Sequence, residues 1–295
     1  MELRQLKYFL KAQELLSFTE AAHSLHITQS TLSQQIRQLE TELGTPLFNR
    51  LGRQVTLTEA GRLFVDFAVQ SVQKAEEGAL MIRDLHNLHT GTVSIGVAYG
   101  LRDFFTGALI SFASQYPDIN VRVVYEPSHV LFEKLDQFEL DFILAFHESA
   151  VAPHFRYQRL FSSPMILAAS PATGIAGKKR VSLEEICQLP LAIATKGYNI
   201  SHIISQAFQK NKLTPQFKIE VNDIPTVLQL VKTGKWYSIL VQTSIIMDDD
   251  LVAIPINNKS LTRVTKIISL KNAYETNAVK VFKKILVKAI PTAEL

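Results

Sequence analysis

Hydrophobic residues between Ser17 and Leu43 recur at helical spacing in two short runs. The first run is Phe18, Ala21, Ala22 and Leu25, and the second is Leu32, Ile36, Leu39 and Leu43. Because residues three or four apart lie on one side of a helix, each run forms an apolar stripe. Ser17 and Glu20 have the spacing of a capping box, and Thr28 can cap the second run. We therefore predict two short helices separated by a tight turn near His26.

The polar side of the second predicted helix carries hydroxyl and amide groups where a solvated helix usually carries Glu and Lys. These groups match the donors and acceptors of base edges in the major groove of DNA. The pattern therefore favours a DNA recognition helix, and an ordinary helical hairpin with a polar outer face is the alternative. The candidate DNA-contacting residues of this helix are Thr28, Gln29, Ser30, Thr31, Ser33, Gln34 and Arg37.

The stretch from Thr45 to Thr58 has the signals of a small β-hairpin. It contains a proline break, an Arg-Leu-Gly-Arg turn and an alternating strand with Val55 and Leu57. Arg50 and Arg53 would lie near the tip of this hairpin. Two arginines there would reach DNA phosphates, so both join the candidate DNA-contacting residues.

Three segments within residues 1–61 resemble, without gaps, the winged helix-turn-helix head of the LysR-type transcriptional regulators. They are MELRQLKYFL, SFTEAAHSLHITQSTLSQQIRQLETELGTPLFNR and GRQVTLTEAG. That family commonly has Pro where Ser30 stands and often Arg where Gln35 stands. Residues 222–240 and 270–284 look most like regulators of the cyanate-operon type. The resemblance implies a protein that binds double-stranded operator or promoter DNA, a small-molecule effector and RNA polymerase, and that assembles as a dimer or tetramer.

A long helix is predicted from Glu59 to about Leu88, because Thr58 can cap it and no proline interrupts it. At ~1.5 Å per residue it spans roughly 45 Å. Its apolar stripe has large residues at both ends and small ones in the middle: Leu63, Phe64, Phe67, Ala68, Val72, Ala75, Ala79, Met81, Ile82, Leu85 and Leu88. Both ends cannot be buried on so short a head, so we expect the helix to pair with its own copy, as the resemblance also implies. The alternative is packing on its own downstream domain.

From Val93 onward, continuous apolar strands alternate with helices. The first set is VSIGV, a helix near 104–114, NVRVVY, a helix near 130–138, and DFILAF. Apolar strands separated by helices predict a parallel sheet covered on both faces. A second set begins with a strand at 165–169 and continues with LAIA, KIEV and SILV. The strand at 264–270 and the helix at 276–289 lack partners in that set, so we expect them to return to the first.

The predicted fold class is therefore α/β, with a winged helix-turn-helix at 1–58, a linker and dimerisation helix with its hinge at 59–91, and a two-lobed effector domain at 92–295. The first lobe comprises about 92–161 and 266–295, and the second about 162–265. Crossings near Phe161 and Thr265 would join the lobes. Type 2 periplasmic binding proteins and LysR-type effector domains share this arrangement, in which a ligand lies between lobes beyond the strand ends.

Loops at the carboxyl ends of these strands supply the candidate effector-binding residues. They are Tyr99, Gly100, Arg102, Ser128, His147, Thr195 and Lys196. In the LysR family these loops line the effector pocket, and Ser128 and Thr195 match such positions most directly. Arg102, His147 and Lys196 would make the pocket cationic and suited to a small anion. The alternative for each of the three is a solvated loop charge.

Composition is that of an ordinary globular protein with room for two or three domains: 295 residues, 47% hydrophobic and 20% charged. The single cysteine, Cys187, excludes an internal disulfide, and no apolar run of about eighteen residues or signal sequence is present. We therefore expect a cytoplasmic protein. The net charge of +4 is consistent with nucleic-acid binding, but residues 1–58 carry six Lys or Arg against five Asp or Glu. The placement of Arg37, Arg50 and Arg53 therefore matters more than net charge.

The sequence lacks catalytic and cofactor motifs. It has no GxSxG, no GxxxxGK[ST], no HExxH and no glycine fingerprint after Val93, so we predict no enzyme activity and no cofactor. The pairs His23 with His26 and His86 with His89 lack further zinc ligands, so no metal site is expected. We interpret Asp248–Asp250 as a solvated turn, and the basic run after Lys259 as a solvated helix face or a second polyanion surface. A solute-binding protein would explain only residues 92–295, and an enzyme would need a catalytic cluster in the cleft.

Overall fold

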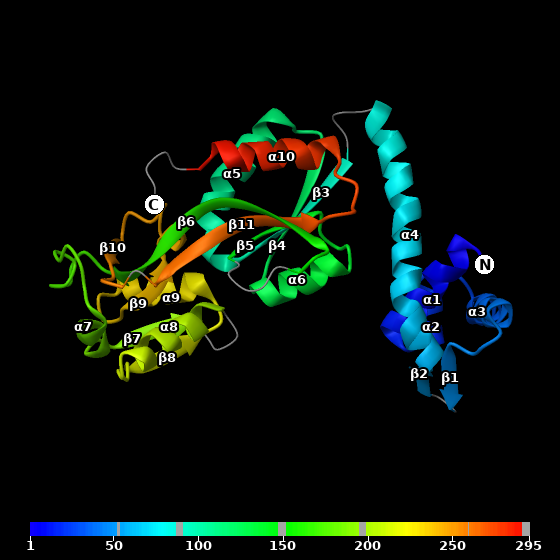
Figure 1. Ribbon diagram of the computed structural model, residues 1–295, viewed down its shortest axis with the longest axis horizontal. Coiled ribbons are helices and arrows are strands. Elements are labelled where there is room, and N and C mark those ends of the chain that lie inside the picture. Colours follow the sequence, from blue (N-terminus) through cyan, green and yellow to red (C-terminus); the bar gives the residue numbers. More distant parts are fainter. Residues whose placement is uncertain (52–53, 87–90, 147–151, 195–198, 259, 291–295) are drawn as a thin grey trace. The chain divides into compact units, whose positions relative to one another are not determined.

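The computed structural model describes the chain except for residues 52–53, 87–90, 147–151, 195–198, 259 and 291–295 (Figure 1). For residues 50–51, 54, 83–86 and 199–202 the backbone alone is described. The described residues form two compact units, Met1–His86 and Asn87–Leu295. Within these described parts, no helix combines the length and apolarity needed to cross a membrane.

The first unit is a helical head with a β-hairpin. Its elements are α1 (Leu3–Leu15), α2 (Phe18–Ser24), α3 (Gln29–Leu43), β1 (Phe48–Leu51), β2 (Gln54–Leu57) and α4 (Glu59–His86). The Ser17 hydroxyl accepts a hydrogen bond from the Glu20 N–H, and the Thr28 hydroxyl accepts one from the Thr31 N–H, so both predicted N-caps are confirmed. β1 pairs antiparallel with β2, which confirms the predicted hairpin.

The core of the head is aromatic. The Phe9 ring centroid lies 5.5 Å from that of Phe48 and 5.4 Å from that of Phe64. Three of the four residues in the predicted apolar stripe of α3 pack on this core and are fully buried, namely Leu32, Ile36 and Leu39, whereas Leu43 is exposed. Burial of that stripe fixes the rotation of α3 about its axis, so its opposite, polar side faces solvent.

Helix α4 uses two faces, whereas the sequence predicted one stripe. Phe64 and Ala68 pack on the head, while the side chains of Leu63 and Phe67 are each 68% exposed. The difference arises because Leu63 and Phe67 lie about 60–140° around the helix from Phe64 and Ala68 at ~100° per residue. Gly61 allows the close approach of α4 to the segment before β1, since an added Cβ would lie 2.1 Å from the Leu47 carbonyl oxygen.

The second unit begins with a parallel sheet covered on both faces. β3 (Gly91–Val97) lies between β4 (Ile119–Tyr125) and β5 (Phe142–Phe146), parallel to each. Helices α5 (Arg102–Gln115) and α10 (Asn277–Lys288) cover one face, and α6 (Ser128–Asp136) covers the other (Figure 1). The short helix η1 (Tyr99–Leu101) joins β3 to α5. These elements confirm the parallel first lobe and the return of the last helix to it.

Two long antiparallel strands join the lobes. β6 (Phe155–Ala169) pairs with β11 (Thr262–Leu270), with Phe161 opposite Thr265 and a register shift between Thr265 and Lys266. Both predicted crossings are therefore confirmed. β11 also pairs with β5, which confirms its return to the first lobe. The predicted strand at 165–169 is only the second half of β6.

The second lobe is built around that half of β6. It is flanked by β9 (Ser238–Val241) and β10 (Val252–Pro255), and β7 (Leu191–Ala194) pairs in parallel with β8 (Phe217–Val221). The helices of this lobe are α7 (Leu183–Cys187), α8 (Asn199–Lys210), α9 (Ile224–Lys232) and the short η2 (Gln242–Ser244). The Asp223 side chain caps α9 by accepting a hydrogen bond from the Thr226 N–H. The neighbouring η2 packs against α5 of the first lobe.

The basic run near the C-terminus is not entirely solvated. Lys283 of α10 is 9% exposed, donates to the Ser269 hydroxyl at 3.1 Å and pairs with Glu275. Lys280, Lys284 and Lys288 of the same helix are exposed. One lysine of the run therefore belongs to the core of the first lobe.

Candidate functional site

The outer face of α3 exposes the candidate residues that the sequence placed there. Thr28, Gln29, Ser30, Thr31, Gln34 and Arg37 are exposed, and Ser33 is half-buried. At the start of the helix, the Thr28 hydroxyl hydrogen bonds to those of Ser30 (2.9 Å) and Thr31 (2.7 Å). This cluster lies at the positive end of the helix dipole, which favours contact with a phosphate. Gln34 and Arg37 lie farther along the same exposed face.

Arg50 of the hairpin lies in β1, but its side chain, like all of Arg53, lies outside the described residues. His147, Thr195 and Lys196 of the predicted effector set lie outside them too. So do His89 and the side chain of His86. Among the described residues, no group of three or more His, Cys, Asp or Glu could hold a metal ion.

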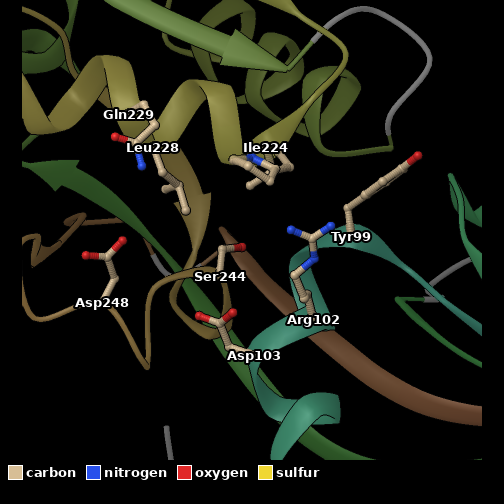
Figure 2. A pocket seen from close by; sticks show the side chains of 9 residues that line it. Tyr99, Arg102, Asp103, Ile224, Leu228, Gln229, Ser244 and Asp248 are labelled. Carbon is tan, nitrogen blue, oxygen red and sulfur yellow. The ribbon is translucent and has the colours of Figure 1, made fainter. Parts of the chain in front are cut away.

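A pocket of about 140 Å³ lies between the two lobes, where the start of α5 meets α9 and η2 (Figure 2). Its lining residues are Tyr99, Arg102, Asp103, Ile224, Pro225, Leu228, Gln229, Ser244 and Asp248. Tyr99 and Arg102 come from the predicted set. Gly100 is buried beside the pocket, where its carbonyl accepts a hydrogen bond from the Thr243 hydroxyl at 2.7 Å. Ser128 begins α6 and is not among the lining residues.

Arg102 and Asp103 are charged residues in the first turn of α5. The Arg102 guanidinium lies over the Tyr125 ring, 5.0 Å from its centroid. Burial raises the pKa of the Asp103 carboxyl, while a hydrogen bond from the Met247 backbone N–H and the charge of Arg102 oppose that rise. Since Asp103 belongs to the first lobe and Met247 to the second, this bond links the lobes.

Asp248 corrects the prediction that residues 248–250 are a solvated turn. Its side chain is 16% exposed, and its Oδ1 lies 2.8 Å from the Lys232 Nζ. Lys232 also lies 3.2 Å from Asp250, which is exposed. The turn is therefore held onto α9 by an ion pair, and this places Asp248 in the pocket wall.

Sequence reasoning missed Asp103, Ser244 and Asp248 as pocket residues. Asp103 could have been found from its position beside Arg102 at the start of a predicted helix. Ser244 and Asp248 carried no such signal, because their place depends on how β9 and η2 of the second lobe meet the first.

Two family models together match most of the chain. The LysR substrate binding domain matches residues 86–291, and the bacterial regulatory helix-turn-helix protein, lysR family, matches residues 3–62. The chain belongs to the LysR family. This LysR-family chain is therefore a transcriptional regulator with a DNA-binding helix-turn-helix and a ligand-binding domain, rather than an enzyme.

Related transcriptional regulators align with most of the length of this chain. The uncharacterized HTH-type transcriptional regulator YybE of Bacillus subtilis (strain 168) is 28% identical over 290 residues, covering 97% of this chain and 98% of the relative. The HTH-type transcriptional activator CmpR of Synechocystis sp. (strain ATCC 27184 / PCC 6803 / Kazusa) is 27% identical over 238 residues, covering 81% and 78%.

Solved structures share the fold of the regulator. A full-length OxyR variant from Pseudomonas aeruginosa aligns with a TM-score of 0.72 at 21% identity, covering 98% of this chain and 94% of that one. CbnR complexed with its target DNA aligns with a TM-score of 0.65 at 20% identity, covering 98% and 100%. These likenesses confirm the predicted fold class of a winged head, a long helix and a two-lobed α/β domain.

Proposed function

We propose that residues 1–58 of the regulator read operator DNA through the outer face of α3. The observation that supports this most is the exposed, largely uncharged polar face opposite the buried stripe of Leu32, Ile36 and Leu39. Its proposed DNA contacts are Thr28, Gln29, Ser30, Thr31, Ser33, Gln34 and Arg37, with Arg50 and Arg53 of the hairpin. Gln34 contacts a base edge, since its amide both donates and accepts, and the arginines of the hairpin contact phosphates.

Residues 59–91 hold two copies together, and residues 92–295 bind a small polar effector between the first lobe (92–161 and 266–295) and the second (162–265). The pocket that contains Tyr99 and Arg102 supports this assignment. Gly100, Ser128, His147, Thr195 and Lys196 complete the proposed effector-binding set from the family positions. The regulator needs no cofactor for this function, because the effector acts by changing how the two lobes meet.

Finer assignments follow from the family resemblance. Residues 222–240 and 270–284 support a place in the cyanate-operon-type branch, and the relative CmpR bears the name of an activator. The regulator works in the cytoplasm, where bacterial chromosomal DNA lies, as a dimer or tetramer. It acts on transcription through contact with RNA polymerase.

The experiment that tests DNA reading is selection of bound sequences from random duplexes, with wild type, Gln34→Ala and Gln209→Ala compared. Gln209 is an exposed glutamine of α8, outside the head and the linker helix, and controls for the chemical change itself. Gln34→Ala should cost ~1–3 kcal/mol on the selected site and relax one base position, because a base edge loses its bidentate partner. Gln209→Ala should leave the selected sequence unchanged. Equal losses on selected and random DNA for Gln34→Ala would contradict the proposal.

A further inference from the structure

The pocket between the lobes presents charges of both signs in different places. Figure 2 shows the Arg102 guanidinium on one side of Ser244, the Asp248 carboxyl group on the other, and the Asp103 carboxyl group below Ser244 between them. Arg102 and Asp103 come from α5 in the first lobe, and Asp248 comes from the turn after η2 in the second. A simple anion would meet one favourable and one unfavourable end.

The acidic end has acceptor capacity left for a ligand. The contacts of Asp248 to described residues use Oδ1, which lies 2.8 Å from the Lys232 Nζ and accepts from the Asp250 N–H at 3.2 Å. A carboxylate has about four acceptor positions over two oxygens, so Oδ2 can accept from a ligand. Asp103 adds a second carboxyl to the pocket wall.

Ser244 provides an independent sign that the pocket is built for a polar ligand. Its side chain lines the pocket, is 5% exposed, and its Oγ has no hydrogen-bond partner among the described residues. Buried hydroxyl groups are normally hydrogen-bonded, and an orphan in a pocket wall points to a group that arrives with the ligand. The hydroxyl lies between the cationic and acidic ends, so it can bond to either end of one small molecule.

The volume of the pocket limits the size of that molecule. A cavity of roughly 150 Å³ accommodates a benzene-sized ligand of six non-hydrogen atoms. The pocket volume of about 140 Å³ therefore suits a molecule the size of a small amino acid. Ile224 and Leu228 of α9 form an apolar wall that can contact its methylene groups.

We propose that the effector pocket takes a small zwitterion, with its carboxylate on Arg102, its ammonium group on Asp103 and Asp248, and the Ser244 hydroxyl between them. The proposal rests on the proposed effector function and replaces the anion that the sequence predicted with a bipolar ligand. An ammonium group bridging Asp103 and Asp248 would also join the lobes, since the two residues belong to different ones.

The first test is calorimetry on the full-length regulator with a panel of small amino acids. The probes are L-alanine, L-serine and the ω-amino acids from glycine to 5-aminopentanoate, each with the carboxylate that lacks the amine and the amine that lacks the carboxylate. At least one zwitterion should bind tenfold or more tightly than both of its matched partners. A carboxylate that binds as tightly as its zwitterion, or no binding by any zwitterion of the panel, overturns the proposal.

The second test compares Asp248→Asn with Asp249→Asn. Asp249 is the exposed neighbour and does not line the pocket, so it controls for the loss of one charge from this turn. Asp248→Asn should weaken the zwitterion on the order of tenfold to a hundredfold, since a charge-assisted hydrogen bond is lost. It should not weaken the matched carboxylate, which loses only a repulsive charge, and Asp249→Asn should change neither. Asp103→Asn, which leaves the Lys232 ion pair intact, should give the same pattern as Asp248→Asn, and equal affinity in all three variants contradicts the assignment.

DNA footprints distinguish failure of the zwitterion proposal from failure of the proposed effector function. A carboxylate that binds all variants equally and changes the footprint rejects the zwitterion and keeps the effector pocket. A zwitterion that binds through Asp248 but changes no footprint keeps the ligand class and rejects its effector role.

Discussion

Asp141 is a half-buried and Lys283 a buried charged side chain of the first lobe, and their titration is linked to folding. The Asp141 carboxylate accepts a hydrogen bond from the Ser94 N–H at 2.7 Å. Burial raises the pKa of Asp141, against that hydrogen bond and the charge of Lys283. Burial also lowers the pKa of Lys283, against its pairing with Glu275. The lobe therefore contains charges whose desolvation is only partly offset.

Asp141→Asn should make stability depend less on pH. Because the folded-state pKa lies above 3.8, Asp141 contributes stability below 3.8 that is lost as pH rises through the folded-state pKa. Asn does not titrate, and its side-chain oxygen can still accept a hydrogen bond from the Ser94 N–H. The free energy of unfolding of the variant should therefore rise relative to that of wild type as pH increases from the unfolded-state pKa to the folded-state pKa. The gain should be about 1.4 kcal/mol for each pH unit that separates the folded-state pKa from the unfolded-state pKa. Urea unfolding followed by the fluorescence of Trp236, the single tryptophan, measures this difference.

The matched control for that series is Asp118→Asn, which removes an exposed carboxyl from the same lobe. When plotted against pH, its free energy of unfolding should differ from that of wild type by a constant amount. A constant offset between Asp141→Asn and wild type from about pH 3.5 to 7 would show that burial of Asp141 is not linked to folding as described.

Local side-chain patterns predicted those residues whose roles depend on near neighbours. Ser17 and Thr28 were identifiable as caps because the N–H groups they accept from lie three residues away. Ser244 and Asp248 were not, because their positions follow from the meeting of chain segments 143 residues apart, as the Thr243 bond to Gly100 shows. The apolar or charged character of a residue carries no record of such distant partners.

Helix α4 leaves large apolar side chains exposed. Leu63 and Phe67, beside the face that packs on the head, are each 68% exposed, and Ile82, beyond the head and in line with Phe64, is 58% exposed. Exposed large apolar groups along one helix face mark a surface that another chain covers. This distribution supports pairing through Leu63, Phe67 and Ile82 more than through the small residues of the predicted stripe.

Phe67→Glu should disrupt dimerisation of the regulator. A carboxylate placed in a covered apolar seam is costly, and a loss on the order of 3 kcal/mol raises the dimer Kd about a hundredfold. Operator binding should fall with it, because two half-sites must be held one helical turn or its multiples apart. Sedimentation velocity over a concentration series measures the assembly.

Leu80→Glu is the control for that substitution, since it makes the same kind of change at a 42% exposed leucine. Thirteen residues from Phe67, it lies about 140° around the helix at ~100° per residue. Its dimer Kd should stay close to that of wild type. If both variants dissociate equally, or if Phe67→Glu remains a tight dimer, the seam lies elsewhere.

Strand β6 shows why element boundaries were harder to predict than element types. Its first half lies at the edge of the first lobe, with exposed Arg156 and Gln158, whereas residues 165–169 lie between β9 and β10 and are fully buried. The sequence pattern therefore changes from alternating to continuous within one strand. Pattern reasoning detected the buried half and treated it as the start of a new element.

The two lobes and the DNA-reading head make the regulator a coupled system. A ligand between the lobes can shift the balance of conformations only by its difference in affinity for them. If bound effector changes the affinity for operator DNA by a certain factor, bound operator DNA must change the affinity for the effector by the same factor. This reciprocity holds whatever path connects the pocket to the head.

Calorimetry of the effector with and without saturating operator duplex should therefore give affinities that differ about 5- to 150-fold, matching ~1–3 kcal/mol of coupling. The same factor should appear in operator affinity measured with and without effector. A scrambled duplex of equal length is the control and should leave effector affinity unchanged. Unequal factors in the two directions would indicate a third linked equilibrium, such as assembly, and equal affinities throughout would exclude coupling.

The position of β11 between β5 and β6 has a consequence for how the chain matures during synthesis. β5 and β6 are made early, but the strand that joins them, Thr262–Leu270, is translated only after every strand of the second lobe. Until then the first lobe has an open sheet edge and lacks α10. We expect the second lobe, although encoded inside the first, to be the earlier of the two to fold on the ribosome. The usual N-to-C order of maturation would then be inverted within this one unit.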